Sequence, residues 1–337
     1  MDYYIKIISN KAKNDVNSIV ESLGYRNLAP ERQQSDMLTR FMVKLAGILN
    51  ILLYLKKDDI LFLQYPMKKF YSIACLFAHL KKAKVVTLVH DLGAFRRHKL
   101  SPEKETILLN KSDFLIIHNE SMMKWLQEQN VKSQLHCLNI FDYLSPSIPA
   151  TYSTPHNEWK VVYAGGLGIW RNAFLYKLDP VINIWQMELY GKGLDTKRKD
   201  SWNRINYHGC LTPDQLLATV EGDFGLVWDG DDLDRCSGDW GEYLKINNPH
   251  KCSFYLRCQL PVIIWEEAAL APFIRESGTG ICIKTLNEID KVLKDITPEQ
   301  YLEMKQRATC IGEKLSQGYY TKKALTEAHT FFQSKQE

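Results

Sequence analysis

The sequence predicts an α/β protein made of two successive Rossmann-like domains with parallel sheets. Short runs of Val, Ile and Leu alternate with segments of helical period, which is typical of parallel strands joined by crossover helices. Residues 145–155, SPSIPATYSTP, interrupt this alternation, because eight of the eleven positions are Pro, Ser or Thr and disfavour regular structure. A chain of 337 residues also has the length of two domains of ~100 to 200 residues each.

The first predicted domain covers residues 1–147. Its strands are expected at 3–8, 60–64, 84–89, 113–118 and 134–138. Its helices are expected at 37–55, 70–82, 101–110 and 119–129. The last two helices begin at Ser101-Pro102 and at Asn119, which are favourable residues for a helix N-terminus.

The second predicted domain covers residues 148–315, and a C-terminal helix occupies 316–337. Its strands are expected near 160–164, 185–191, 204–209, 223–228, 260–265 and 280–283. Helical patterns at 297–315 and 319–333 close the chain, and the pattern alone does not say where they pack.

The composition is that of a reduced, cytosolic protein. The eight cysteines form no C-x-x-C pair and lie mostly in apolar segments, which argues against a disulfide framework or a zinc site. The N-terminus lacks the basic and long apolar regions of a signal peptide. The longest uncharged apolar stretch, at 45–55, has eleven residues against the ~20 that span a bilayer. We therefore expect no membrane crossing.

The charge is unevenly distributed. Residues 1–150 contain 21 Lys and Arg against 14 Asp and Glu, a net charge of +7, whereas the rest of the chain has a net charge of −3. These cations are either solvated helix ends or a surface facing anionic lipid head groups or a lipid-pyrophosphate acceptor. Nucleic acid is disfavoured as a partner, because no aromatic-interleaved basic helix or known nucleic-acid module is present. The basic runs are Lys56-Lys57, Lys68-Lys69, Lys81-Lys82 and 96–99.

Candidate site residues follow the predicted strands, since ligands of open α/β sheets bind outside the carboxyl ends of the strands. His90 and Asp91 follow the strand at 84–89, and either side chain could act as a general base toward a hydroxyl group. The structural alternative is that Asp91 caps the next segment and His90 packs in the core.

A glycine-rich turn follows the strand at 160–164. Gly165 and Gly166 would let the backbone approach a phosphate, and Arg171 could hold phosphate oxygens in bidentate fashion. The spacing is not G-x-G-x-x-G. Glu188, roughly twenty residues further along the chain, keeps an NAD-dependent Rossmann enzyme as an alternative.

An acidic stretch begins at Trp228. An EF-hand is excluded, because Leu233 and Trp240 occupy the fifth and twelfth positions of the loop. Asp229 and Asp231 match the D-x-D of metal-dependent glycosyltransferases, but such short matches occur by chance in acidic loops. Otherwise these acids are solvated, with Asp229 or Asp231 touching ligand hydroxyls.

A basic helix start follows at 248–253. Its residues are Asn248, Pro249, His250, Lys251, Cys252 and Ser253. A lysine in the first helical turn opposes the helix dipole unless an anion lies against it, and a sugar-nucleotide diphosphate would supply that anion.

These motifs together resemble bacterial β-1,6-galactofuranosyltransferases of O-antigen and capsule assembly. The segments that carry the resemblance are FGLVWDGDD, CSGDWGEYLKINNPHK and LPVIIWEEAALAPFI, with VHD at 89–91, IFDYL at 140–144 and YAGGLG in the same order. The resemblance covers residues 60–320 and is most specific at 223–275. Gly166 departs from the family, which often has a side chain there.

The resemblance implies a GT-B fold, in which two Rossmann-like domains face a cleft and the last helix crosses back to the first domain. It also implies a UDP-sugar donor in the second domain, a glycan acceptor in the first, and no metal or other cofactor. Residues 248–253 would hold UDP, Arg171 the diphosphate, and the backbone at Gly209-Cys210 the uracil. Trp228, Asp229 and Asp231 would lie beside the donor.

The expected reaction is an inverting transfer of galactofuranose from its UDP donor to a sugar hydroxyl, with Asp91 or His90 as the base. The acceptor is expected to be lipid-linked, and the enzyme is expected to lie peripherally at the inner face of the cytoplasmic membrane. A homo-oligomer is compatible with the sequence, which does not determine the oligomeric state. The alternatives are a UDP-glucose transferase acting on a protein- or lipid-linked glycan, the NAD-dependent enzyme, and a sugar-nucleotide sensor without turnover.

Overall fold

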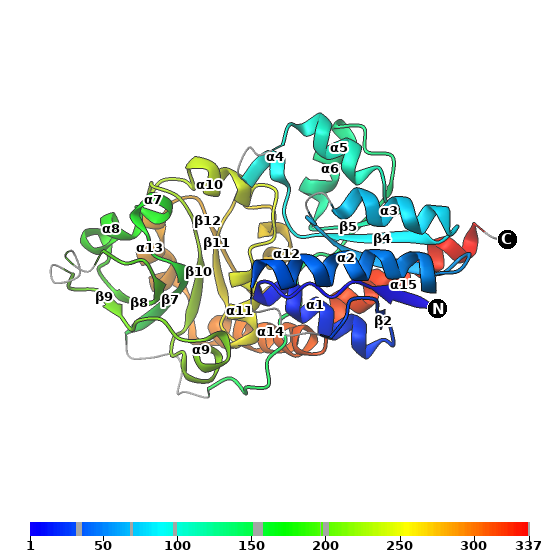
Figure 1. The fold of residues 1–337 in the computed structure, drawn as a ribbon. Coiled ribbons are helices and arrows are strands. Elements are labelled where there is room, and N and C mark those ends of the chain that lie inside the picture. Colours follow the sequence, from blue (N-terminus) through cyan, green and yellow to red (C-terminus); the bar gives the residue numbers. More distant parts are fainter. Residues whose placement is uncertain are drawn as a thin grey trace. The chain divides into compact units, whose positions relative to one another are not determined.

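The chain forms two compact α/β units. The computed structural model describes residues 1–31, 36–67, 70–96, 100–150, 158–195, 197 and 202–335. The first unit consists of Met1–Asp142 together with Gly318–Glu337, and the second of Tyr143–Gln317. Each unit contains a six-stranded parallel sheet with helices between its strands (Figure 1). The predicted α/β class with two parallel sheets is therefore confirmed.

The sheet of the first unit has the strand order β2-β1-β3-β4-β5-β6. The strands are β1 (Asp2–Tyr4), β2 (Arg26–Asn27), β3 (Ile60–Tyr65), β4 (Lys84–Val89), β5 (Phe114–Ile117) and β6 (Gln134–Cys137). The helices before the last one are α1 (Lys11–Ser22), α2 (Met37–Tyr54), α3 (Phe70–Leu80), α4 (Gly93–Arg96), α5 (Pro102–Leu109) and α6 (Glu120–Glu128). Ser101 and Asn119 cap α5 and α6 through their side chains, as predicted.

The last helix, α15 (Tyr319–Ser334), belongs to the first unit, where it contacts α1 and β6. Its first turn is held by Asp142, whose carboxylate accepts the backbone N–H groups of Tyr320 at 3.1 Å and Thr321 at 2.7 Å. Burial raises the pKa of Asp142 to about 6. The last helix returns to the first domain, as the resemblance implied, and Asp142 bonds to its first turn across 178 positions of the sequence.

The sheet of the second unit has the order β12-β11-β10-β7-β8-β9. The strands are β7 (Trp159–Gly166), β8 (Trp185–Lys192), β9 (Ile205–Tyr207), β10 (Phe224–Val227), β11 (Val262–Trp265) and β12 (Gly280–Ile283). The α-helices are α7 (Ile169–Asn172), α8 (Leu175–Leu178), α9 (Pro213–Thr219), α10 (Gly238–Leu244), α11 (His250–Arg257), α12 (Ala271–Ser277), α13 (Ile289–Asp295) and α14 (Pro298–Ser316). Two 3-10 helices are η1 (Asp179–Val181) and η3 (Leu286–Glu288).

The core of the second unit is packed closely around Tyr255 of α11. A Cβ atom added to Gly225 of β10 would lie 2.1 Å from the Tyr255 ring, so only glycine fits there. The Tyr255 hydroxyl accepts the backbone N–H of Ala164 at 2.9 Å. This packing ties α11 to the ends of β7 and β10, from which the candidate donor residues project.

The boundary between the units lies earlier than the predicted linker. Ser145 donates a hydrogen bond to Asp214 at 2.6 Å, and Arg257 donates one to the carbonyl of Ser147 at 3.3 Å. Residues 143–150 therefore belong to the second unit, whereas the predicted domain boundaries were 147/148 and 315/316. The remainder of the predicted linker, at 151–157, is outside the described residues.

One helix of the described residues, α2, is long and apolar enough to cross a membrane by length and composition alone. Only 22% of that window is buried within the protein. A single helix of this kind is weak evidence for a span, because the core helices of soluble proteins satisfy the same criterion.

Candidate functional site

Two cations and one carboxylate meet at the carboxyl ends of β7 and β10. The Nζ of Lys251, in the first turn of α11, lies 3.1 Å from Oδ1 of Asp229 and 3.3 Å from the carbonyl oxygen of Trp228. It also donates to the hydroxyl of Tyr163 at 3.0 Å. The Nη2 of Arg171 lies 3.3 Å from the same Asp229 oxygen. We call Arg171, Asp229 and Lys251 the charged cluster.

By formal charge the cluster has an excess of one positive charge, since Arg171 and Lys251 share a single carboxylate. Burial lowers the pKa of Lys251, Asp229 opposes this shift, and Arg171 reinforces it. Asp229 therefore supplies an anion beside the first-turn lysine, which the sequence alone assigned to a bound diphosphate. The excess positive charge of the cluster, and not the position of Lys251 in its helix, favours phosphate binding.

Arg171 is oriented by stacking. Its guanidinium lies 3.9 Å from the ring centroid of Trp240 in α10, a cation–π contact. Its buried Nε makes no hydrogen bond within the described part of the chain. An unpaired buried donor costs about 1–3 kcal/mol, so this nitrogen favours a ligand acceptor at the charged cluster.

The helices beside the charged cluster begin without side-chain caps. Gly168 precedes α7 and Pro249 precedes α11, and neither position makes a side-chain capping hydrogen bond. The N–H of Arg171 already donates to the carbonyl of Gly168 at 3.0 Å, and that of Cys252 to the carbonyl of Pro249 at 2.9 Å. The earliest N–H groups of a helix have no acceptor within it, and phosphate oxygens commonly bind there. His250 stacks on the Tyr143 ring at 4.9 Å, which fixes the start of α11.

Several predicted donor residues have core side chains. Trp228 and Cys252 are fully buried, and Asn248 and Ser253 nearly so. The indole N–H of Trp228 donates to the carbonyl of Asp232 at 3.0 Å, and burial raises the pKa of the Cys252 thiol. Because the side chains of Trp228 and Cys252 are buried, they are poorly placed to contact the donor. Only the backbone of these two segments would then contact it.

Three other predicted donor residues lie at the surface. Gly165 and Gly166 form the exposed end of β7, and Cys210 is exposed after β9. A Cβ atom on Gly191 would lie 1.8 Å from the carbonyl oxygen of Gly165, so the ends of β7 and β8 approach closely only with glycine there. Gly166 has room for a side chain, because its added Cβ would meet only Arg171, at 3.9 Å.

The D-x-D pair is divided between two environments. Asp229 is buried against the two cations, whereas Asp231 is exposed. The backbone of Asp231 is fixed by Ser237, which accepts its N–H at 3.1 Å, and by Lys177, which donates to its carbonyl at 2.7 Å. Within the described residues, no group of three or more His, Cys, Asp or Glu side chains could hold a metal ion.

Glu188, the acid that NAD binding would require, is already bonded to other side chains. Glu188 is buried, pairs with His208 and accepts a hydrogen bond from Asn206 at 3.1 Å. It lies four positions before the end of β8, whereas a ribose-binding acid belongs at the carboxyl end of its strand. The structure therefore disfavours a dinucleotide at this position.

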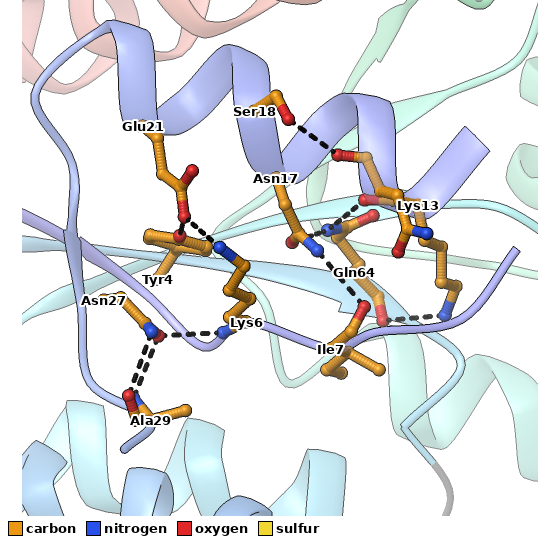
Figure 2. Close-up of polar contacts among 11 residues, drawn as sticks. Tyr4, Lys6, Ile7, Lys13, Asn17, Ser18, Glu21, Asn27, Ala29 and Gln64 are labelled. Carbon is orange, nitrogen blue, oxygen red and sulfur yellow. Dashed lines mark hydrogen bonds and ion pairs between the residues drawn. The ribbon is translucent and has the colours of Figure 1, made fainter. Parts of the chain in front are cut away.

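In the first unit, His90 is held by a series of amide groups. The carbonyl of Ile7 can only accept, so the Asn17 amide must donate to it, at 3.2 Å. The Oδ1 of Asn17 then accepts from Nε2 of Gln64 at 2.7 Å, and Gln64 Nε2 also lies 3.3 Å from the Lys13 carbonyl (Figure 2). The Oε1 of Gln64 consequently accepts from Nε2 of His90 at 2.7 Å. His90 therefore carries a proton on Nε2.

Lys13 is a buried lysine beside these hydrogen-bonded amide groups. Burial lowers the pKa of Lys13 to about 8, and the carboxylate of Asp91 opposes that shift. The Nζ of Lys13 donates to the carbonyl of Pro66 at 3.2 Å. Sequence reasoning missed Lys13, Asn17 and Gln64, and the detectable signal was Asn10, whose side chain caps the unpredicted helix α1.

The structural alternative for Asp91 was to cap the next segment. That segment is α4. The N–H groups at its N-terminus donate to another residue, the buried Glu105. The N–H of Gly93 donates to one Glu105 oxygen at 2.7 Å and that of Ala94 to the other at 2.8 Å. Asp91 is half-buried after β4 and contributes electrostatically to Lys13.

Family models place the chain among known proteins. A model described as the glucosyltransferase 3-like N-terminal domain matches residues 6–140, and its C-terminal counterpart matches residues 161–328. The chain is also 32% identical over 275 residues to the β-1,6-galactofuranosyltransferase WbbI of Escherichia coli (strain K12), which covers 81% of this chain and 80% of that protein. The chain belongs to the glucosyltransferase 3-like family. It is therefore a glycosyltransferase, as the sequence motifs predicted.

Other similarities of this glucosyltransferase 3-like chain agree with the assignment. Glucosyltransferase 3 of Streptococcus gordonii is 25% identical over 327 residues, covering 94% of this chain and 92% of that protein. The apo lipopolysaccharide outer core galactosyltransferase WaaB superposes with a TM-score of 0.54 at 11% identity, covering 97% and 98% of the two chains. A putative UDP-N-acetylglucosamine 2-epimerase from Listeria monocytogenes gives 0.54 at 11% identity, covering 99% and 96%. These structures support the GT-B fold of two Rossmann-like domains.

Proposed function

We propose that this chain transfers galactofuranose from UDP-galactofuranose to a sugar hydroxyl of a glycan in bacterial surface polysaccharide, O-antigen or capsule. The observation that carries the proposal is the charged cluster, which has one uncompensated positive charge and an unpaired buried Arg171 Nε at the carboxyl ends of the strands. The choice of galactofuranose is supported by the similarity to WbbI.

The donor diphosphate would occupy the charged cluster. Arg171 offers Nε to one phosphate oxygen, Lys251 offers its ammonium, and the uncapped starts of α7 and α11 offer backbone amides. Cys210 and Gly209 would lie beside the uracil. Negative charge grows on UDP as the glycosidic bond breaks, so fixed cations that strengthen their contacts at that moment lower the barrier without a metal ion.

The acceptor hydroxyl would be deprotonated in the first unit. Its oxygen forms a bond to the anomeric carbon on the face opposite UDP, the bond to the diphosphate oxygen breaks, and the proton passes to Asp91 or His90. Nε2 of His90 already carries the proton that it donates to Gln64, so Nε2 would not be the accepting atom. A single displacement of this kind inverts the anomeric configuration.

A glucosyl donor is the second candidate. The matching family models are described as glucosyltransferase 3-like, and two relatives named glucosyltransferase 3 cover more than nine-tenths of this chain. Donor identity depends on a few contacts to sugar hydroxyls, which a shared fold does not fix.

The acceptor is proposed to be lipid-linked and the enzyme to work at the cytoplasmic face of the membrane. The basic first half of the chain, with a net charge of +7 over residues 1–150, supports this placement. A lipid-linked glycan would then reach the first unit from the membrane surface.

The test is a panel of UDP-galactofuranose, UDP-galactopyranose and UDP-glucose with a simple alkyl glycoside acceptor, with and without EDTA. We expect transfer from UDP-galactofuranose alone, an inverted linkage by NMR, and unchanged rates in EDTA. Faster turnover of UDP-glucose would establish the second candidate instead. Reversible loss of activity on chelation would restore the metal-dependent D-x-D interpretation. Absence of both transfer and UDP binding would reject the proposed function.

A further inference from the structure

The first unit exposes an apolar face on α2 and α3, two helices that pack side by side (Figure 1). In α2, Leu38, Met42, Leu49 and Leu53 recur at intervals of four, seven and four positions and therefore share one face. Each is between 50% and 74% exposed. An apolar stripe of this length is unusual on a monomeric surface and indicates a binding partner.

Helix α3 extends the same kind of surface. Ile73, Leu76 and Leu80, at intervals of three and four positions, are between 39% and 65% exposed. We call the exposed residues of α2 and α3 the apolar face. Its members are Met37, Leu38, Phe41, Met42, Leu49, Leu52, Leu53, Tyr54, Ile73, Leu76 and Leu80.

The opposite side of α2 is fixed in the protein. Val43, Ile48 and Ile51 are buried, and a Cβ atom on Gly47 would lie 3.2 Å from the Cα of Ala29. A helix packed this closely along one side does not leave its domain to span a bilayer. Its geometry is that of an amphipathic helix lying on a surface.

The charged residues within α2 and α3 themselves have one sign, whereas the acids Asp36, Asp58 and Asp59 flank α2 in the sequence. Residues 37–57 contain four Lys and Arg, residues 70–82 contain two Lys, and neither segment contains Asp or Glu. Each helix is followed by a lysine doublet, Lys56-Lys57 or Lys81-Lys82. The doublets adjoin, because the N–H of Asp58 donates to the carbonyl of Lys82 at 3.0 Å. The basic run at 68–69 is outside the described residues.

This charge distribution selects between two occupants. A symmetric dimer would place the apolar face against its own copy, so that two surfaces with positively charged helices would meet. An anionic membrane would take the apolar side chains between its lipids and place head-group phosphates beside the lysines.

We propose that the apolar face binds peripherally to membranes rich in anionic phospholipid. The inference rests on the proposed function in one respect, since a lipid-linked acceptor would be met at that surface. Membrane binding itself does not require transfer, so the two can fail separately.

The experiment measures co-sedimentation of the full chain with phosphatidylcholine vesicles, with and without about 30 mol% phosphatidylglycerol. We expect binding that needs the anionic lipid and weakens between about 0.05 and 0.5 M salt. The variant L49E/L53E should lower the partition coefficient at least about tenfold. The control L23E/I107E makes the same changes at exposed apolar positions of the first unit outside the apolar face and should bind normally.

Two outcomes would overturn the inference. Normal vesicle binding by L49E/L53E would show that the apolar face is not the docking surface. A concentration-dependent dimer that L49E/L53E dissociates, without vesicle binding, would make a second copy the occupant. Transfer to a soluble glycoside, measured on the same variants, should stay within about twofold of the wild type and reports on the proposed function separately.

Discussion

Replacing single members of the charged cluster should move UDP affinity in opposite directions. The formal net charge of the cluster is +1, and it becomes 0 in Lys251→Met and +2 in Asp229→Asn. A hydrogen bond to a charged group contributes about 1.5–3 kcal/mol, so Lys251→Met should weaken UDP binding about 10- to 150-fold. Asp229→Asn should bind UDP at least as tightly as the wild type.

The same variants should rank differently in their free energy of unfolding. Asp229→Asn leaves two buried cations without a counter-ion, which costs about 3–5 kcal/mol. Lys251→Met costs less, because Asp229 keeps Arg171 at 3.3 Å. The double variant K251M/D229N should recover part of the loss, since it removes one cation together with the carboxylate. Saturating UDP should stabilise Asp229→Asn more than the wild type.

The assays are isothermal titration with UDP and urea unfolding with and without UDP. Lys245→Met is the matched control, because Lys245 is a partly exposed lysine of the same unit that pairs with Glu242 at 3.2 Å and Glu267 at 3.4 Å. Surface pairs contribute about 0–1 kcal/mol, so this variant should behave as the wild type. A Kd for Lys251→Met within about threefold of the wild type would refute the phosphate role. Weaker UDP binding by folded Asp229→Asn would show that the carboxylate itself contacts the donor.

The packing of Gly225, the titration of Asp142 and the exposure of Cys210 can each be tested. Gly225→Ala should destabilise the protein by about 1–3 kcal/mol or more in urea unfolding, because its Cβ would lie 2.1 Å from the Tyr255 ring; an unchanged midpoint would contradict this packing. Folding raises the pKa of Asp142 from 3.8 to about 6, so the folded protein binds this proton more tightly and loses up to about 3 kcal/mol of stability as the pH rises through that window. Asp142→Asn should abolish that part of the pH dependence, and parallel pH curves for the two proteins would refute it. Cys210 and Cys310 should react first with a thiol reagent in the native protein, and UDP should slow Cys210 alone; equal protection of both would argue against uracil binding beside Cys210.

The buried strands could be predicted from the sequence because parallel strands covered on both faces are continuous apolar runs. The predictions at 60–64 and 84–89 agree with β3 and β4 to within one residue. Helix α1 was missed, since its inward side chains include Lys13, Asp15 and Asn17, which break the apolar period. A helix that contributes polar groups to a buried cluster does not show the pattern that identifies an ordinary amphipathic helix.

The charged cluster could be predicted only in part. The sequence indicated that Lys251 needs an anion but not that Asp229, 22 positions earlier, supplies one. Tyr163 and Trp240, which contact the two cations, carry no local signal, because one lies within a strand and the other within a short helix. Pairings of this kind follow from strand order and helix docking, which local sequence does not encode.

The acidic stretch at 229–242 is compatible with an anion-binding site because only one of its acids belongs to the charged cluster. Asp229 is buried there, whereas Asp231, Asp234, Asp239 and Glu242 are exposed to solvent and Asp232 is partly exposed. A single buried carboxylate can hold Arg171 and Lys251 in place before the donor arrives, so their charges need little reorganisation during transfer. A second buried acid would cancel the remaining positive charge. The affinity for a diphosphate therefore depends on the cluster having one carboxylate for two cations.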